Sequence, residues 1–325
     1  MTAAEYAAGV RGADRTILGR AFTLVESRKP ADRAVAEELL QLLSRDSNHN
    51  AVRLGVTGAP GVGKSTFIEA LGKRLIAQGH RVAVLAVDPS SEISGGSILG
   101  DKTRMPELSR SAQALVRPSP SGGALGGVHN RTREAILLCE AAGFDIVIVE
   151  TVGVGQSETQ VASMTDCFLV LIGPGAGDHL QGIKRGVIEL ADALVVTKAD
   201  GDSASLAENT RQEFAHALEL LHADRDGWQP RVLTCSSLED QGIAETWATV
   251  AEHREFLLSN NRLAERRRQQ RLRWFHEVVD ALLRERFLTD PTTAARLESL
   301  AAQVLRGELT PSAAAQAALS ATSQA

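Results

Sequence analysis

Residues 52–66 read VRLGVTGAPGVGKST, an apolar run that passes through a glycine-rich turn into Lys-Ser-Thr. The pattern G-x-x-x-x-G-K-[ST] between a strand and a helix is typical of a loop that cradles nucleotide phosphates with backbone amides. We expect Lys64 to reach the β and γ phosphates and the Ser65 hydroxyl to ligate Mg²⁺. The expected phosphate-binding residues are Gly58, Ala59, Pro60, Gly61, Val62, Gly63, Lys64, Ser65 and Thr66.

Outward from this loop, short apolar runs alternate with turns and helical stretches. Continuously apolar runs of this kind are typical of parallel strands covered by helices on both faces. The sequence therefore predicts an α/β fold with a doubly wound, mainly parallel sheet over residues 51–258. The expected strands are 52–58, 82–88, 145–150, 167–173, 193–200 and 231–237, with 114–118 as a further short strand.

The two flanks of this domain are expected to be helical. Residues 1–50 carry apolar residues at helical spacing, which predicts an N-terminal helical extension. Residues 259–325 contain helix signals alone and have too little core to fold separately, so this arm should pack on the sheet domain or on a second copy of the chain. Six arginines between 262 and 273 are interpreted as a solvated helix face, with a binding site for an anionic partner as the alternative.

Composition excludes several classes of protein. The 325 residues carry a formal net charge of −5, which lacks the basic bias of a nucleic-acid binder. No apolar run is long enough to span a bilayer, and no signal pattern opens the chain, so we expect a soluble, cytoplasmic protein without membrane contact. Cys139, Cys167 and Cys235 lie far apart in apolar contexts, which favours buried reduced thiols over a disulfide framework or a zinc cluster.

Carboxylates are expected where two strands end. Asp88 ends the run at 82–88, and Glu150 ends the run at 145–150. Ligands of open α/β sheets bind at the carboxyl ends of the strands, so both side chains should lie near the phosphate loop. Together with Ser65, they are the expected Mg²⁺ ligands.

The choice of base is indicated by Thr197-Lys198-Ala199-Asp200. A carboxylate at Asp200 can accept both the imino and the amino proton of guanine, and the Lys198 stem can lie on the purine face. This predicts GTP and GDP as ligands, although Thr197 stands where GTPases usually have Asn. The backbone expected to close on the base oxygen is that of Ser236, Ser237 and Leu238.

These residues together resemble the MeaB, ArgK and MMAA family of P-loop GTPases. The carriers are residues 58–66, 87–91, 94–105, 117–128, 150–158, 177–186 and 197–202. The resemblance implies hydrolysis of GTP to GDP and phosphate, and homodimers joined through the C-terminal helices. It also implies a chaperone that loads and protects an adenosylcobalamin-dependent acyl-CoA mutase, methylmalonyl-CoA mutase being the default, with an adenosyltransferase as a candidate second partner.

Two polar loops are candidates for the hydrolytic machinery. The segment 89–104 resembles a switch that orders on the γ-phosphate, with Asp101 as a magnesium or water ligand, or merely a helix cap, and Arg104 as a candidate for meeting developing charge. The segment 173–185 resembles the family's extra switch. There Lys184 is a candidate for stabilising transition-state charge, with a solvated lysine as the alternative.

Two other functions share the fold. A nickel-inserting metallochaperone GTPase would normally show a Cys-x-x-His or His-rich tract, and the sequence has none. A small-molecule kinase, for example one acting on an amino acid, should offer an enclosed acceptor pocket and a dedicated base. The sequence indicates only flexible loops around the phosphates.

Overall fold

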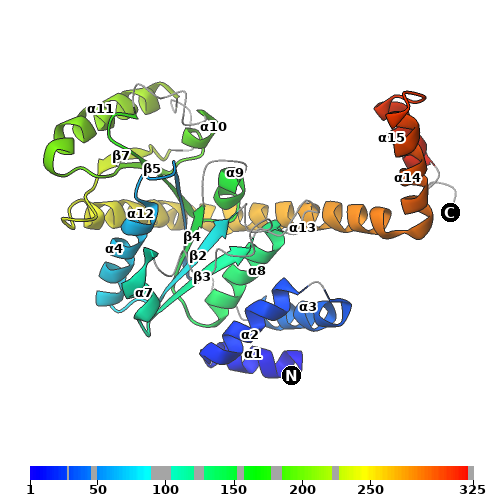
Figure 1. The fold of residues 1–325 in the computed structure, drawn as a ribbon. Coiled ribbons are helices and arrows are strands. Elements are labelled where there is room, and N and C mark those ends of the chain that lie inside the picture. Colours follow the sequence, from blue (N-terminus) through cyan, green and yellow to red (C-terminus); the bar gives the residue numbers. More distant parts are fainter. Residues whose placement is uncertain are drawn as a thin grey trace. The chain divides into compact units, whose positions relative to one another are not determined.

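The computed structural model describes residues 1–27, 29–44, 50–88, 104–120, 128–151, 157–176, 185–221 and 227–320 (Figure 1). Residue contacts divide the chain into two compact units. The larger unit holds Met1–Gly122 and Val128–Arg271, and the smaller is built chiefly from Leu272–Ala325. The domain limits expected after residues 50 and 258 stay predictions.

Seven parallel strands form one sheet in the order β3-β2-β4-β1-β5-β6-β7. Strand β1 is central and pairs with β4 and β5. The predicted α/β class with a doubly wound parallel sheet is confirmed. The run expected at 193–200 stops at Val196, because Lys198 adopts a left-handed φ of 56° that ends the extended backbone. The strands are β1 (Val52–Gly58), β2 (Val82–Asp88), β3 (Ala114–Pro120), β4 (Ile146–Thr151), β5 (Cys167–Ile172), β6 (Ala193–Val196) and β7 (Arg231–Thr234).

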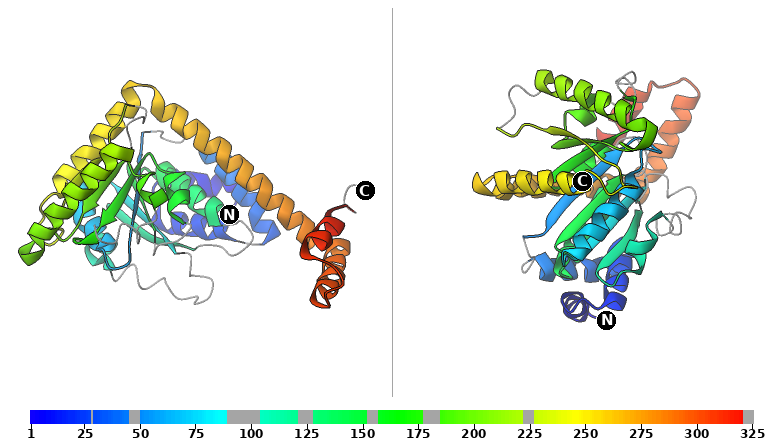
Figure 2. Two further views of the ribbon diagram at one scale, coloured as in Figure 1. Left: turned by 90° about the horizontal axis from the view of Figure 1, so that it is seen from above. Right: turned by 90° about the vertical axis from the view of Figure 1, so that its left-hand side faces the viewer.

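Helices cover both faces of the sheet, and Figure 2 shows them from two further sides. Alternate strand residues point to opposite faces, so Val84 packs with the face that carries α4, whereas Leu85 packs with the face that carries α8. Helices α4 (Lys64–Ala77), α7 (Pro106–Arg110) and α12 (Ile243–Ser259) cover the first face. The second face is covered by α8 (Val128–Ala141), α9 (Ser157–Ala162), α10 (Arg185–Ile188) and α11 (Ala204–Leu221).

The expected N-terminal helical extension consists of α1 (Ala3–Arg11), α2 (Arg15–Glu26) and α3 (Pro30–Ser44). Helix α1 begins with a capping box between Thr2 and Glu5. All three helices contribute buried apolar residues to the core that includes α8. They extend the apolar cover of the sheet and do not form a separate core.

The smaller unit is helical throughout its described part. It contains the end of α13 (Arg262–Thr289), then α14 (Pro291–Leu305) and α15 (Pro311–Ser320). Helix α14 begins at the Asp290 cap, whose carboxylate accepts from the Thr293 amide. Large apolar side chains here are exposed to solvent in the single chain: Leu272, Phe275, Leu282, Leu283, Leu305 and Leu319.

The start of α13 corrects the solvated-face interpretation for two of the six arginines, whereas Arg268, Arg271 and Arg273 are exposed as that interpretation expects. Arg267 is 4% exposed and makes a bidentate pair with the buried Asp166 just before β5, at 2.9 and 2.6 Å. Arg266 donates to Asp192 just before β6 at 3.1 Å. Burial alone would raise the pKa of Asp166, but hydrogen bonds and charge from Arg267 and Arg53 hold it below its usual value. The spacing of the arginines along one helix does not reveal their carboxylate partners, because those partners come from distant parts of the chain.

None of the described helices combines the length and apolar character that crossing a bilayer requires.

Candidate functional site

The phosphate loop, residues 58–66, connects β1 to α4 at the carboxyl edge of the sheet. Gly58 approaches β5 so closely that a Cβ there would lie 2.5 Å from the Leu171 carbonyl oxygen. Gly63 is the N-cap of α4 with a left-handed φ of 98°, which glycine adopts without strain. Since glycine has no side chain to cap the helix, amides of the first turn of α4 can bind an anion.

Lys64 is held inside this loop. It is 8% exposed, and its Nζ donates to the carbonyl oxygens of Gly58 at 2.7 Å and Ala59 at 3.2 Å. Burial lowers the pKa of Lys64, and the negative charge of Glu150 opposes that change. The ammonium group is therefore placed within the cradle, where phosphate oxygens would be better partners than neutral carbonyls.

Ser65 and Glu150 meet beside the loop. The Ser65 hydroxyl donates to Glu150 Oε1 at 3.2 Å, and Glu150, near the end of β4, is 3% exposed. A hydrogen bond of 2.7 Å between Thr57 and Thr151 joins the ends of β1 and β4. These contacts bring two hard oxygen donors together, and such donors fit Mg²⁺. Asp88 ends β2, and its side chain lies outside the described residues.

Thr197 and Lys198 tie the segment predicted to read the base to the phosphate loop. Thr197 Oγ1 donates to the Val62 carbonyl at 2.6 Å, within a site where Thr197 is 2% exposed. Lys198 Nζ donates to the Gly61 carbonyl at 2.8 Å. The hydroxyl of Thr197 thus supplies a brace between the two segments even though it stands in place of the usual Asn.

Asp200 is positioned by the turn that follows β7. The Ser236 hydroxyl donates to Asp200 Oδ2 and also accepts from the Glu239 amide at 3.1 Å. The Ala199 amide donates to the Cys235 carbonyl at 3.0 Å. One oxygen of the Asp200 carboxylate is therefore fixed by Ser236, which orients the group for a pair of donors such as guanine offers.

Comparison with known proteins identifies the family of this chain. The family described as "Methylmalonyl Co-A mutase-associated GTPase MeaB" matches residues 18–292. This chain belongs to the MeaB family. It is a GTPase, and its family implies binding of guanine nucleotides. The resemblance read from the motifs is confirmed.

Relatives of this MeaB-family GTPase span bacteria and mammals. GTPase ArgK of Escherichia coli strain K12 is 52% identical over 279 residues, covering 86% of this chain and 84% of that protein. "Methylmalonic aciduria type A homolog, mitochondrial" of Mus musculus is 46% identical, covering 97% of this chain and 78% of that protein. A solved structure named LAO/AO transport system kinase has a TM-score of 0.77 at 40% identity, covering 99% of this chain and 98% of that one.

The structure describes the other predicted site residues of this MeaB-family GTPase only in part. Arg104 is exposed, and it is close enough to Lys64 for its charge to lower the pKa of that lysine. Leu238 is 82% exposed on the turn after Ser237. Asp101 and Lys184 lie outside the described residues.

One buried acid near the phosphate loop escaped the sequence analysis. Glu158, in the first turn of α9, is 2% exposed, and its negative charge, like that of Glu150, opposes the lowering of the Lys64 pKa by burial. It is the last residue of the motif ETVGVGQSE at 150–158. A glutamate in the first turn of a helix is also common for a structural reason, because its negative charge interacts favourably with the helix dipole. The signal was therefore present in the sequence without being distinctive.

Proposed function

We propose that this GTPase couples GTP binding and hydrolysis to cofactor loading and protection of an adenosylcobalamin-dependent acyl-CoA mutase, of the methylmalonyl-CoA mutase type. The observation that carries the proposal is the family match over residues 18–292, whose description names that mutase. The name of the mouse relative, which refers to methylmalonic aciduria, supports the same partner. A role for an adenosyltransferase and a cytoplasmic location stay predictions from the sequence.

In this proposal, nucleotide binding exchanges contacts that the loop already makes. Lys64 leaves the carbonyls of Gly58 and Ala59 for the β and γ phosphates, which offer it charged acceptors. Loop amides bind the same phosphates. At the other end of the site, Asp200 accepts the two guanine protons while the Lys198 stem lies on the purine face.

The residues also fit a magnesium ion. Ser65 and Glu150 would hold it together with Asp88, with Asp101 as a further candidate ligand. When bound, Mg²⁺ neutralises charge on the phosphates during cleavage. Glu150 already orients the Ser65 hydroxyl, so part of this site is formed before an ion enters.

Hydrolysis should be slow for the chain alone and faster with the mutase. The residues proposed to meet the developing charge are Arg104 and Lys184, which belong to the two segments that the sequence predicts to be switches, 89–104 and 173–185. Charge supplied by such ordering is worth about 10³ to 10⁵ in rate in well-studied GTPases, so even partial ordering would be measurable.

The test is single-turnover release of labelled phosphate from Mg·GTP, with and without the mutase. Lys184→Ala should keep intrinsic turnover and GDP affinity but lose stimulation. Lys73→Ala removes an exposed lysine of α4 that pairs with Glu107 of α7, and this variant is expected to keep intrinsic turnover, GDP affinity and stimulation. Full stimulation in Lys184→Ala would exclude the 173–185 loop as the coupling element, and no stimulation of the unaltered chain would contradict the chaperone function.

A second candidate, phosphoryl transfer to an amino acid, is favoured by one observation, the kinase name of a solved structure that is 40% identical. Incubation with γ-labelled GTP and arginine, lysine or ornithine separates the two functions. The chaperone proposal expects label in inorganic phosphate alone, whereas a labelled amino acid would support the kinase.

A further inference from the structure

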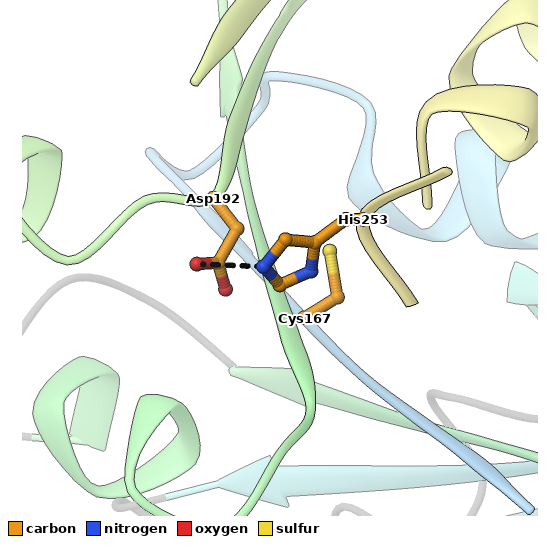
Figure 3. A group of neighbouring side chains, drawn as sticks. All are labelled: Cys167, Asp192 and His253. Atoms are coloured by element: carbon orange, nitrogen blue, oxygen red, sulfur yellow. Dashed lines mark ion pairs between the residues drawn. The ribbon is translucent and has the colours of Figure 1, made fainter. Parts of the chain in front are cut away.

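A second cluster of chemically active side chains lies away from the phosphate loop. Cys167 begins β5, Asp192 precedes β6, and His253 comes from α12 (Figure 3). Both strands start here, so the cluster lies at the amino edge of the sheet, opposite the edge that carries the phosphate loop. The three side chains point toward one another, and their ligand atoms all lie within 4.8 Å of one another.

Each of these side chains is buried, and one has unused bonding capacity. Cys167 is 2% exposed, Asp192 8% and His253 2%. Among the described residues, Nδ1 of His253 has no hydrogen-bond partner. A buried polar atom without a partner is costly, and in native proteins a bound water or ion commonly satisfies it.

The surroundings hold these groups in place as outer contacts hold metal ligands. Asp192 Oδ2 accepts from the Phe168 amide at 2.8 Å and from Arg266 at 3.1 Å, while Oδ1 faces His253 Nε2 at 3.5 Å. The Trp228 ring packs against the imidazole with centroids 4.8 Å apart. One carboxylate oxygen is thus anchored, and the other is directed into the cluster.

We propose that Cys167, Asp192 and His253 form a binding site for one divalent transition-metal ion of borderline softness, such as Zn²⁺ or Co²⁺. A thiolate, an imidazole and a carboxylate are the donors such ions prefer, whereas Mg²⁺ and Ca²⁺ prefer oxygen alone. Tetrahedral bonds of about 2.0 to 2.3 Å place ligand atoms about 3 to 4 Å apart, so a small closure of the cluster suffices. On binding, the thiol proton is released to solvent and the sulfur coordinates as thiolate.

Arg266 limits the affinity of this site. Its guanidinium offsets the charge of Asp192, and only one thiolate is available. We therefore expect an affinity in the micromolar range and not the tight binding of zinc sites with several thiolates.

The test is titration of the full chain with Co²⁺ in saturating Mg·GDP, which keeps Mg²⁺ at the phosphate loop. Binding should give the near-ultraviolet absorption of a cobalt–thiolate bond with one ion per chain, and Zn²⁺ should abolish it. Cys167→Ser should remove the band, and His253→Gln should weaken Co²⁺ binding at least tenfold. Cys139→Ser, which alters another fully buried thiol on α8, should change neither.

GDP affinity serves as the check that each variant is folded. Absence of a thiolate band in the unaltered chain at millimolar Co²⁺ would overturn the proposal. A band that survives Cys167→Ser in a chain that still binds GDP would overturn it as well. Should Cys167→Ser fail to fold, the His253→Gln titration alone decides, since an unchanged band and affinity there would exclude the site.

Discussion

Thr197 joins the segment predicted to read guanine to the phosphate loop through one hydroxyl, which donates to the Val62 carbonyl. Thr197→Val keeps the shape of the side chain but leaves that buried acceptor without its donor, at a cost of about 1 to 2 kcal/mol. We expect the Kd for GDP to rise about tenfold, measured by calorimetry. Thr23→Val removes a hydroxyl that donates to a carbonyl within the exposed part of α2, so this control should leave the Kd unchanged. Equal affinities in the two variants would show that the brace does not matter for binding.

Asp200 should decide which purine binds. Asp200→Asn keeps an acceptor for Ser236 but replaces the second carboxylate oxygen with a donor, which faces a donor on guanine. GTP affinity should fall at least tenfold, and xanthosine triphosphate, which presents an acceptor there, should bind better than it does to the unaltered chain. Competition against a fluorescent GDP analogue measures both. Unchanged GTP affinity in Asp200→Asn would mean that the base is read elsewhere.

Candidate residues for the nucleotide site could be selected from the sequence because they follow one another in short motifs. The sequence placed Lys64 and Ser65 in the loop and Glu150 at a strand end, and the structure brings these three together. The Cys167–Asp192–His253 cluster could not be predicted, because its members come from three separate segments and no spacing relates them. Their proximity depends on the order of the strands in the sheet.

Helix α8 contains a carboxyl group whose titration should affect stability. Glu134 is partly buried where α8 packs against α2 and α3. Burial raises its pKa to about 8, opposed by Arg131 and reinforced by Glu37 and Glu26. Between pH 4.5 and 8 the folded chain keeps this proton, whereas the unfolded chain has released it, so stability falls as pH rises through that window. The free energy of unfolding should drop by about 1 to 2 kcal/mol from pH 6 to pH 8 on this account.

Glu134→Gln should remove this dependence and make the protein more stable at pH 8 than the unaltered chain. Urea unfolding at pH 6, 7 and 8 measures the effect. Glu38→Gln makes the same charge change at an exposed position on α3 and should leave the pH profile as it was. Parallel profiles for the unaltered chain and Glu134→Gln would be incompatible with the raised pKa.

At the level of elements, the strands were predictable and the role of α13 was not. Every expected run contains a strand, because residues buried on both faces must be apolar, although the runs at 193–200 and 231–237 end early at Val196 and Thr234. The arginines of α13 follow the pattern of a solvated helix. Only the positions of Asp166 and Asp192 at the strand starts show that Arg267 and Arg266 are anchors.

The whole molecule is expected to be a homodimer formed through the smaller unit. Apolar side chains on α13 are exposed in the single chain, for example Phe275 at 59% and Leu283 at 62%. Deleting residues 272–325 should therefore leave a monomer that binds GDP, as judged by light scattering and calorimetry. A monomeric intact chain at micromolar concentration would contradict this.

Deletion from residue 260 is the matched comparison. It also removes Arg266 and Arg267 and leaves the buried carboxylates of Asp166 and Asp192 without these partners. Loss of one partner of a buried pair costs about 3 to 5 kcal/mol, so this shorter chain should unfold at a lower urea concentration than the chain ending at Arg271. Equal stability of the two truncated chains would show that these ion pairs do not stabilise the packing of the start of α13 within the larger unit.

The central place of β1 has a consequence for synthesis on the ribosome. The first strand to emerge pairs only with β4 and β5, so both of its edges stay open until the chain has grown past Ile146 and then Cys167. Meanwhile β2 and β3 can pair with each other, but not with β1. A nascent chain halted before residue 146 therefore presents an apolar strand with two free edges. Such a segment tends to aggregate or to be bound by molecular chaperones. In the folded enzyme, strands on both sides of β1 surround the start of the phosphate loop. During much of translation, the same central position leaves β1 without a neighbouring strand.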